Sequence, residues 1–261
     1  MKNLAGLNKW VALAVAGFGL VSGGAMATPI TGTGLQSALT TLPQAAIINV
    51  NTDQLGADAF WVVGGTGLIS NVLMFELTTP NAAYNSFGIF DRNVPGSKLE
   101  IFNGANVAGD TETAKKLLLS ANNCFGFGMS VTAAKCSDAT TAAANGNVLF
   151  STPAFGFYLS TKDAQGNVLQ TLYSYDSYNT DLADHMVAFQ GGAGKGSLNG
   201  APWLANEFVL AWEDQAAATG DFDDFVVLVE SVTPVSEPAT LSLLGMGLLA
   251  FGLRNRKKLR A

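Results

Sequence analysis

Two apolar runs late in the chain, residues 208–212 (FVLAW) and 225–229 (FVVLV), decide the fold class. Both are rich in β-branched and aromatic residues and contain no charge, which is typical of strands. The 12 residues between them carry five acids and Gly220, which favours a turn. We therefore predict two strands joined by an acidic connection.

Short apolar or alternating runs recur upstream of this pair, bounded by Gly, Asn, Asp and Pro. They lie at residues 46–50, 60–63, 72–77, 86–90, 98–102, 125–131, 155–160, 168–175 and 186–190. Many short strands separated by turn residues predict an all-β fold, here a single antiparallel β-sandwich or jelly-roll domain over residues 28–235. These 208 residues are enough for a substantial core.

One segment of this domain has a helical pattern, at residues 111–121. Its apolar residues repeat with the spacing of one helix face, at Ala114, Leu117, Leu118 and Ala121. Residues 113–147 are also the least strand-like part of the domain, so we expect an excursion from the sheets there.

Composition and charge exclude several classes of protein. The 261 residues are 48% hydrophobic and 13% charged, which argues against disorder. Residues 28–235 hold seven basic and 19 acidic residues, a formal net charge of −12. Binding of nucleic acid through a basic face is therefore excluded.

The N-terminal segment, residues 1–27, predicts export. Lys2 and Lys9 precede or border an apolar stretch, and Ala25 and Ala27 stand at the −3 and −1 positions of a cleavage site. This order is typical of a signal peptide cut after Ala27 by signal peptidase. The alternative is an uncleaved anchor helix.

The chain contains two cysteines, Cys124 and Cys136. In an exported protein they favour a disulfide, which for a loop of this length stabilises the fold by about 3 kcal/mol.

The C-terminal segment has three parts. A short motif at residues 236–240 leads into an uncharged apolar run at 241–253, and a basic tail follows at 254–261. A helix over the apolar run is shorter than the hydrocarbon core of about 30 Å, so it spans only with thinning and snorkelling. The basic tail places this end on the cytoplasmic side, which puts the body outside the inner membrane.

This arrangement resembles the PEP-CTERM sorting signal of Gram-negative bacteria. Glu237 and Pro238 match the Pro-Glu-Pro motif, Ser236 replaces its first proline, and Ala239 and Thr240 follow. The resemblance implies an exosortase substrate, held transiently in the inner membrane with its body in the periplasm and then released to the cell surface or outside. The alternative is a plain C-terminal anchor.

The acidic connection is a candidate calcium site. Its carboxylates belong to Glu213, Asp214, Asp221, Asp223 and Asp224, and no Lys or Arg occurs at residues 197–253. Crowded carboxylates repel one another, and Ca²⁺ takes six to eight oxygen ligands of this kind. The alternative is a solvated turn whose acids point apart.

The same region resembles the end of the DUF4114 family. The resemblance rests on residues 206–230, with WED, DFDDF and VVLVE, and extends to FGIF at 87–90, GFYL at 156–159 and the Asp184-His185 pair. Thr219 stands where the family has its first acid. The resemblance implies an exported β-rich surface domain and calcium binding.

No catalytic motif was found in the sequence. His185 is the only histidine, and no serine lies in a Gly-x-Ser-x-Gly motif. We therefore expect a non-enzymatic surface or extracellular-matrix protein, associated with exopolysaccharide or biofilm.

Two alternatives remain for the body. The first is a carbohydrate-binding module, calcium-dependent or not, whose aromatic rings stack on sugars if they are exposed, at Trp61, Trp203, Tyr173, Tyr175 and Tyr178. Aromatic residues in strands are more often part of the core. The second is a secreted hydrolase with Glu213 and Asp224 as acid and base.

Overall fold

A computed structural model describes residues 28–41, 43–64, 69–78, 84–103, 115–120, 123–127, 133–214 and 220–235. For residues 69–78, 115–118, 120, 133 and 134 it describes the backbone alone. The predicted signal peptide at 1–27 and the sorting segment at 236–261 lie outside the described residues. Within them, no helix is both long and apolar enough to span a membrane.

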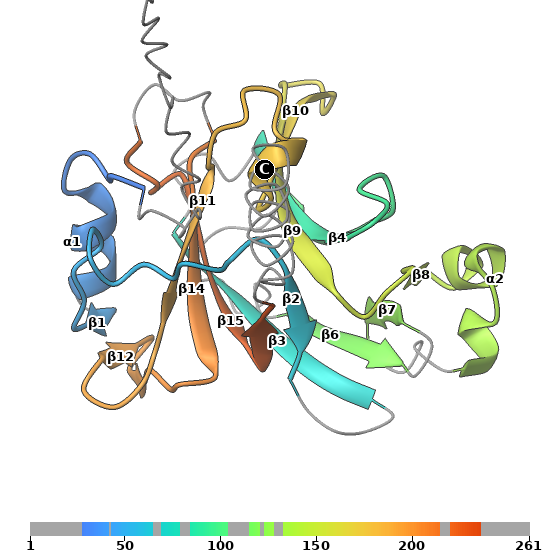
Figure 1. Cartoon of the computed structure of the whole chain (residues 1–261), viewed down its shortest axis with the longest axis horizontal. Helices are drawn as coiled ribbons and strands as arrows, with labels where there is room; N and C mark the ends of the chain where they lie inside the picture. Colours follow the sequence, from blue (N-terminus) through green and yellow to red (C-terminus); the bar gives the residue numbers. More distant parts are fainter. Residues whose placement is uncertain are drawn as a thin grey trace, which may run out of the picture. The chain divides into compact units, whose positions relative to one another are not determined.

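The described chain is built mainly of strands (Figure 1). The strands are β1 Ala45–Ala46, β2 Trp61–Val63, β3 Ile69–Thr78, β4 Asn85–Asp91, β5 Lys98–Phe102, β6 Lys115–Ser120, β7 Cys124–Phe127, β8 Val148–Leu149, β9 Phe155–Lys162, β10 Val168–Tyr173, β11 Met186–Gln190, β12 Gly196–Leu198, β13 Ala201–Pro202, β14 Glu207–Trp212, β15 Phe225–Glu230 and β16 Val232–Pro234. The helices are α1 Gly34–Thr40, α2 Ala139–Ala144 and the short 3₁₀ turns η4 Ala133–Cys136 and η5 Asp176–Tyr178.

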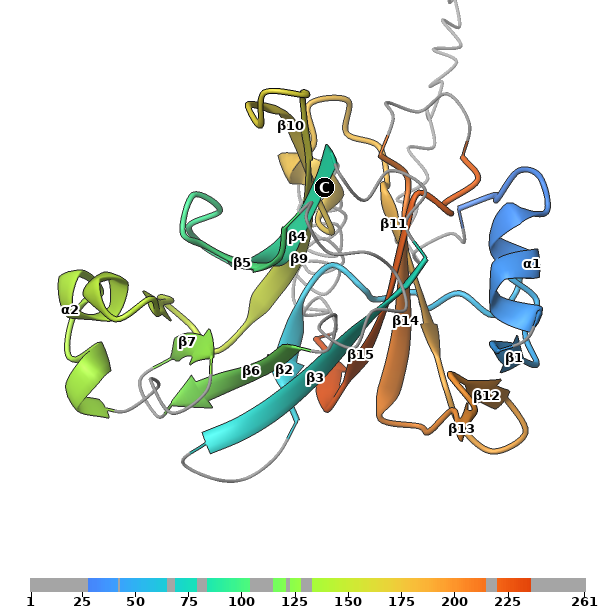
Figure 2. The same ribbon diagram turned by 180° about the vertical axis from the view of Figure 1, so that it is seen from behind.

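The strands form three antiparallel sheets. The largest has the order β11-β14-β15-β3-β6-β7-β8, and the second runs β16-β2-β9-β4-β5 with β10 also paired to β9. A small sheet, β1-β12-β13, lies beside α1 (Figure 2). The prediction of an all-β, antiparallel domain is confirmed.

Both strands of the deciding pair are buried on two faces. In β14, Phe208, Leu210 and Trp212 contact the core shared with the second sheet, and the alternate residues Val209 and Ala211 contact a separate core. Alpha helix α1 contributes to that separate core through Leu35 and Leu39. Because side chains of a strand alternate between faces, cover on both sides explains why FVLAW and FVVLV are apolar throughout.

The core to which both large sheets contribute is dominated by aromatic rings. Phe87 of β4 stacks on Phe157 of β9, with ring centroids 5.5 Å apart, and on Phe225 of β15, 5.2 Å away. Trp61 of β2 meets Phe208 of β14 at 5.0 Å. These pairs join residues distant in sequence and connect the two large sheets through one core.

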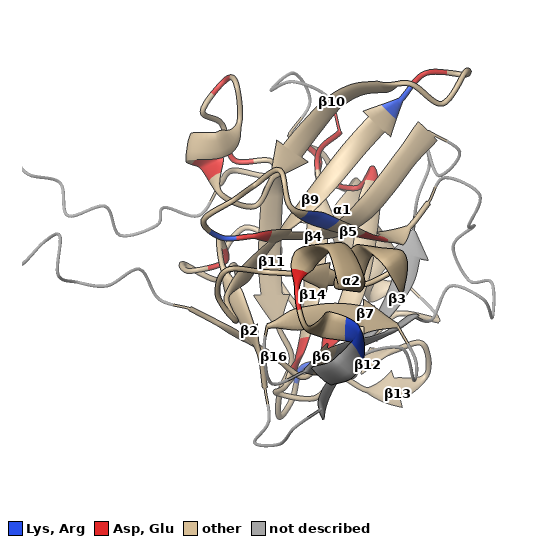
Figure 3. Ribbon diagram, turned by 90° about the vertical axis from the view of Figure 1, so that its right-hand side faces the viewer, with Lys and Arg blue, Asp and Glu red and all other residues tan. Residues whose placement is uncertain are grey.

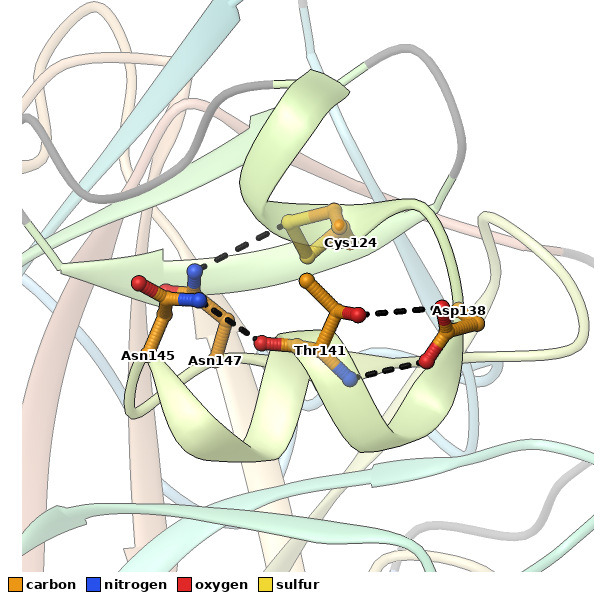
Figure 4. Close-up of a disulfide and its surroundings, with 6 residues drawn as sticks. Cys124, Asp138, Thr141, Asn145 and Asn147 are labelled. Carbon is orange, nitrogen blue, oxygen red and sulfur yellow. Dashed lines mark hydrogen bonds between the residues drawn. A yellow bond between two sulfur atoms is a disulfide. The ribbon is translucent and has the colours of Figure 1, made fainter.

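A small excursion follows β7 and carries the disulfide (Figure 4). Cys124 and Cys136 are bonded, with Cα atoms 6.0 Å apart, and both are buried. Asp138 caps α2 by accepting a hydrogen bond from the Thr141 N–H at 2.8 Å. Asn147 Nδ2 lies 3.7 Å from Cys136 Sγ, so the end of the excursion returns to the disulfide.

The helix predicted over residues 111–121 is wrong where the chain is described. Residues 115–120 form β6, which pairs with β3 on one edge and β7 on the other. Pairing on both edges satisfies the backbone groups of β6, and this non-local gain overrides a local spacing of four apolar residues. The helices form instead at α1 and α2, where no helix is predicted.

Candidate functional site

The acidic connection begins and ends on the paired strands β14 and β15. Trp212 is the cross-strand partner of Phe225, so Glu213 and Asp214 leave β14 beside the point where Asp224 enters β15. Residues 215–219 of the connection lie outside the described residues. The register of the two strands therefore places Asp214 near Asp224, although the two residues are ten positions apart in the sequence.

Three of the five predicted ligands gather there. One carboxylate oxygen from each of Glu213, Asp221 and Asp224 lies within 4.8 Å of the others. The Asp221 N–H donates to Glu213 Oε2 at 3.2 Å, and the Asp214 N–H donates to Asp224 Oδ2 at 3.0 Å. Glu213 is 2% exposed and Asp224 8%, so this carboxylate trio lies largely beneath the surface.

The environment of the trio disfavours negative charge. Burial raises the pKa of Asp224 to about 7, and the neighbouring acids Asp214 and Glu213 add to the effect. Burial also raises the pKa of Asp221, followed by the charges of Asp223 and Glu213. Carboxyl groups in such a place are stabilised either by protons or by a cation.

The other two predicted ligands are held differently. Asp214 Oδ2 accepts a hydrogen bond from Asn85 Nδ2 at 3.1 Å, and Asn85 is itself 3% exposed with no hydrogen bond to its Oδ1. Asp223 packs its carboxylate against Gly34, the first residue of α1, where any side chain would collide with it. Burial raises the pKa of Asp223 as well.

The described lysines that form ion pairs do so elsewhere. Lys162 pairs with Glu100 at 3.3 Å and Lys195 with Asp53 at 2.9 Å. Acidic residues outnumber basic ones over the described part of the chain, as Figure 3 shows. The carboxylate trio gathers three oxygen ligands in one place, a donor set that suits Ca²⁺.

The aromatic residues singled out as sugar-stacking candidates divide into two groups. Trp61 and Trp203 are 0% and 1% exposed, so they are core residues, as is more common for aromatics in strands, and do not provide an exposed platform for a sugar. They are packed in the two cores because a large apolar ring gains most when it is buried. Tyr173, Tyr175 and Tyr178 are partly buried and lie outside the core that joins the sheets.

These three tyrosines belong to an aromatic cluster on the outer face of the second sheet. Its other rings are Phe60, Phe90 and Tyr158. Tyr175 and Tyr178 meet edge to face at 5.0 Å, and the Tyr178 hydroxyl donates to the Arg92 carbonyl at 3.0 Å. The rings therefore support one another in fixed positions.

Two cations that the sequence did not single out lie over this aromatic cluster. Lys98 Nζ is 4.7 Å from the centroid of Tyr173 and 4.9 Å from that of Tyr158. The Arg92 guanidinium carbon is 4.6 Å from the centroid of Phe60. Cation–π contacts of this length are attractive. They depend on strands far apart in sequence, so no local pattern could have revealed them.

His185 is buried and part of the framework. Its Nε2 lies 3.0 Å from Asp181 Oδ2, and its Nδ1 lies 3.2 Å from the Glu213 carbonyl oxygen. The Glu213 N–H in turn donates to the His185 carbonyl at 3.1 Å. The single histidine thus connects the 181–185 segment to the base of the acidic connection.

Comparison with known proteins identifies one segment. The family model of the PEP-CTERM protein-sorting motif matches residues 234–257. No curated protein and no solved structure matches the chain. The motif implies export and processing by an exosortase, while the resemblance of the body to DUF4114 is not supported by any match.

Proposed function

We propose that this chain, which carries a PEP-CTERM sorting motif, is a non-enzymatic surface or extracellular-matrix protein that associates with exopolysaccharide in a biofilm. The motif is the observation that carries the proposal. It begins at Pro234, the last residue of β16, so the body ends where the sorting signal starts. We further propose that the two large sheets form a β-sandwich, with the body in the periplasm before release.

Removal of the sorting segment tests this function. Deleting residues 237–261 is expected to abolish processing and to shift the protein from the cell surface to the periplasm, measured by fractionation and by the mass of the released chain. Replacing Glu237 and Pro238 with alanine keeps the apolar run and basic tail, and is expected to leave an unprocessed, membrane-bound chain. Unchanged processing in both variants contradicts exosortase sorting.

The aromatic cluster supports the association with polysaccharide. Sugar rings stack on aromatic faces, and Lys98 and Arg92 add positive charge on a body that is otherwise acidic. The expected result is slower migration of residues 28–235 in native gels that contain an acidic polysaccharide. Tyr175→Ala and Lys98→Gln should restore the mobility, whereas Val168→Ala, at an exposed position on β10, should not. Equal mobility with and without polysaccharide argues against this partner.

Calcium binding is a second candidate function, favoured by the carboxylate trio. Glu213, Asp221 and Asp224 would supply side-chain oxygens, and carbonyl groups of the connection would complete the shell. The described residues between 28 and 235 belong to one compact unit with its own cores, which supports work on the isolated body. A ligand at about 100 times its dissociation constant adds roughly 2.7 kcal/mol of stability.

The test is thermal unfolding of residues 28–235 in excess calcium and in chelator. A higher midpoint in calcium is expected, and the difference should disappear in the Asp221→Asn, Asp224→Asn double variant. Asp163→Asn, in the exposed turn between β9 and β10, is the matched control and should keep the calcium response. If the unfolding midpoint is the same in calcium and in chelator, the connection is a turn whose carboxyl groups are stabilised by protons rather than by calcium.

Burial of the acids supports a structural rather than a hydrolytic role. Glu213 is 2% exposed and Asp224 8%, which leaves little room for a substrate to reach their carboxylates. Replacing both acids should therefore change the stability of the body and leave any polysaccharide bound to it intact.

A further inference from the structure

The first residues of the predicted mature chain are fastened to the body. The Thr28 carbonyl oxygen accepts a hydrogen bond from Gln54 Nε2 at 2.8 Å. The Ile30 N–H donates to Asn51 Oδ1 at 2.9 Å, and Ile30 is buried. The Thr31 N–H donates to the Gly220 carbonyl at 2.9 Å. Residue 28 is thus a fixed point on the folded domain.

Thr28 meets a group of acids at this point. Its hydroxyl donates to Asp184 Oδ2 at 2.5 Å, while Asp184 Oδ1 accepts the Met186 N–H at 3.1 Å. Asp58 and Asp176 lie close enough to Asp184 to interact with its charge. These three acids, Asp58, Asp176 and Asp184, come from the approach to β2, from η5 and from the approach to β11.

Electrostatics make this acid group unfavourable in the uncut chain. Burial raises the pKa of Asp58 well above its usual value, and the charges of Asp184 and Asp176 raise it further. Burial likewise raises the pKa of Asp184 and of Asp176. The titratable neighbour on the same segment is His185, whose Nε2 is engaged by Asp181. A cation placed beside Asp184 would relieve the repulsion.

Signal-peptide removal would create such a cation at this place. Hydrolysis of the amide between Ala27 and Thr28 consumes one water and yields a carboxylate on Ala27 and an amine on Thr28. That amine is protonated below a pKa of about 8. Within one threonine the α-nitrogen and Oγ1 are at most about 3.7 Å apart. The new ammonium therefore arises within about 6 Å of Asp184 Oδ2, given the hydroxyl contact of 2.5 Å.

We propose that removal of the signal peptide completes a partly buried ion pair between the α-ammonium of Thr28 and Asp184, and that this pair stabilises the mature domain over its precursor. The inference rests on the proposed cut after Ala27. Before the cut, the nitrogen of residue 28 belongs to a neutral amide and carries no charge. Removal of the signal peptide during export would thereby increase the stability of the mature domain through the charge of the Thr28 α-ammonium.

Thermal unfolding of two chains tests the ion pair directly. One is residues 28–235 released from a fusion that leaves Thr28 as the first residue, and the other keeps a Gly-Ser dipeptide ahead of Thr28. The chain that begins at Thr28 should unfold about 2–4 °C higher, the shift expected for a modest stabilisation of a domain of this size. Asp184→Asn should remove the difference between the two chains.

Asp163→Asn is the control, because it lies in an exposed turn and should affect both chains equally. Equal midpoints, or a difference that survives Asp184→Asn, overturn the proposal. If Asp184→Asn does not fold, acylation of the α-amine at pH 7.5 gives the answer. Acylation of the Thr28 α-amine should be about tenfold slower than acylation of the α-amine in the Gly-Ser chain, because the ion pair raises the pKa of the Thr28 amine by about one unit. Equal acylation rates refute the ion pair.

These measurements use chains of defined first residue, so they are independent of how the cell processes the protein. Sequencing the N-terminus of the exported protein tests the cut after Ala27 separately. If the exported protein begins at another residue while the engineered chain shows the ion pair, only the predicted cleavage site is contradicted.

Discussion

At the scale of single residues, position 224 combines burial with negative neighbours. In the folded chain burial raises the pKa of Asp224 to about 7, above its unfolded value of 3.8. The folded state therefore binds more protons than the unfolded state between these two values, and stability falls as pH rises through this window. A carboxyl with a raised pKa thus destabilises the fold most at neutral pH.

This linkage gives a first prediction. In chelator, residues 28–235 should lose about 2 kcal/mol of unfolding free energy between pH 5 and pH 7.5, the size expected for a shift of this kind. Asp224→Asn should flatten the dependence because its amide does not titrate. Denaturant unfolding at the two pH values is the measurement. If the unfolding free energy of the variant changes between the two pH values as much as that of the natural chain, Asp224 does not dominate the pH dependence.

At the scale of elements, the packing of β4 against its neighbours depends on a missing side chain. A Cβ atom at Gly88 would lie 2.7 Å from Tyr158 Cε1 and would also collide with the Leu99 carbonyl oxygen. The backbone oxygen belongs to β5, the cross-strand partner of β4, and cannot move away cheaply. Gly96, in the turn between these strands, has open space where its Cβ would be.

The two glycines make a matched pair for a second prediction. Gly88→Ala should destabilise the domain by about 1–3 kcal/mol, as overpacking does. Gly96→Ala should lie between neutral and about 1 kcal/mol more stable, because it restricts the unfolded chain at no steric cost. Chemical denaturation of both variants checks this. Similar losses at both positions would mean that the strand spacing is not limited by Gly88.

The disulfide excursion gives a third prediction at the same scale. Replacing Cys124 and Cys136 with serine should cost about 3 kcal/mol, since the closed loop no longer restricts the unfolded chain. The loss should be local as well, because the two sulfurs and Ala142 form a small core of their own. Hydrogen exchange should show faster opening at α2 than at β14.

The sequence predicted elements better than it predicted contacts. Strand β11 was predicted to the residue, and β5 likewise, because apolar or alternating runs bounded by turn residues mark strands locally. Strand β6 was missed because its identity depends on pairing with β3 and β7 rather than on its own spacing. The two-residue and three-residue strands β8, β12, β13 and β16 carry too little pattern to be recognised.

The candidate site was predicted in the same uneven way. The acids of the connection could be found from their density alone, but the sequence could not tell that Asp223 turns to Gly34 while Glu213, Asp221 and Asp224 converge. Burial of Trp61 and Trp203 agrees with the general preference of large aromatic rings for the core, but the sequence could not tell which of the five aromatic candidates would be buried.

At the scale of the whole molecule, charge is strongly unbalanced. Residues 28–235 carry a formal net charge of −12, which adds self-repulsion to the folded state. Salt screens this repulsion over a distance of about 10 Å at 0.1 M. The folded body should therefore gain stability when the ionic strength rises.

This imbalance gives a fourth prediction. Raising sodium chloride from 10 to 200 mM at pH 7.5 should increase the unfolding midpoint of residues 28–235 by about 2–4 °C, equivalent to roughly 1 kcal/mol. Replacing sodium with a larger monovalent cation should give the same rise, because screening is not specific. A midpoint that falls with salt would show that the few ion pairs outweigh the repulsion.

Strand β16 also has a mechanical consequence. It is three residues long, pairs with β2 from Val232 to Pro234, and is followed by a hydrogen bond from the Val235 N–H to the Phe60 carbonyl at 2.8 Å. Any tension that reaches the body from its membrane side must pass through this short strand first. Drag on a tethered chain would therefore act first on β16 at the sheet edge, and because Val232 of this strand belongs to the core shared by the two large sheets, peeling it would load that core at once.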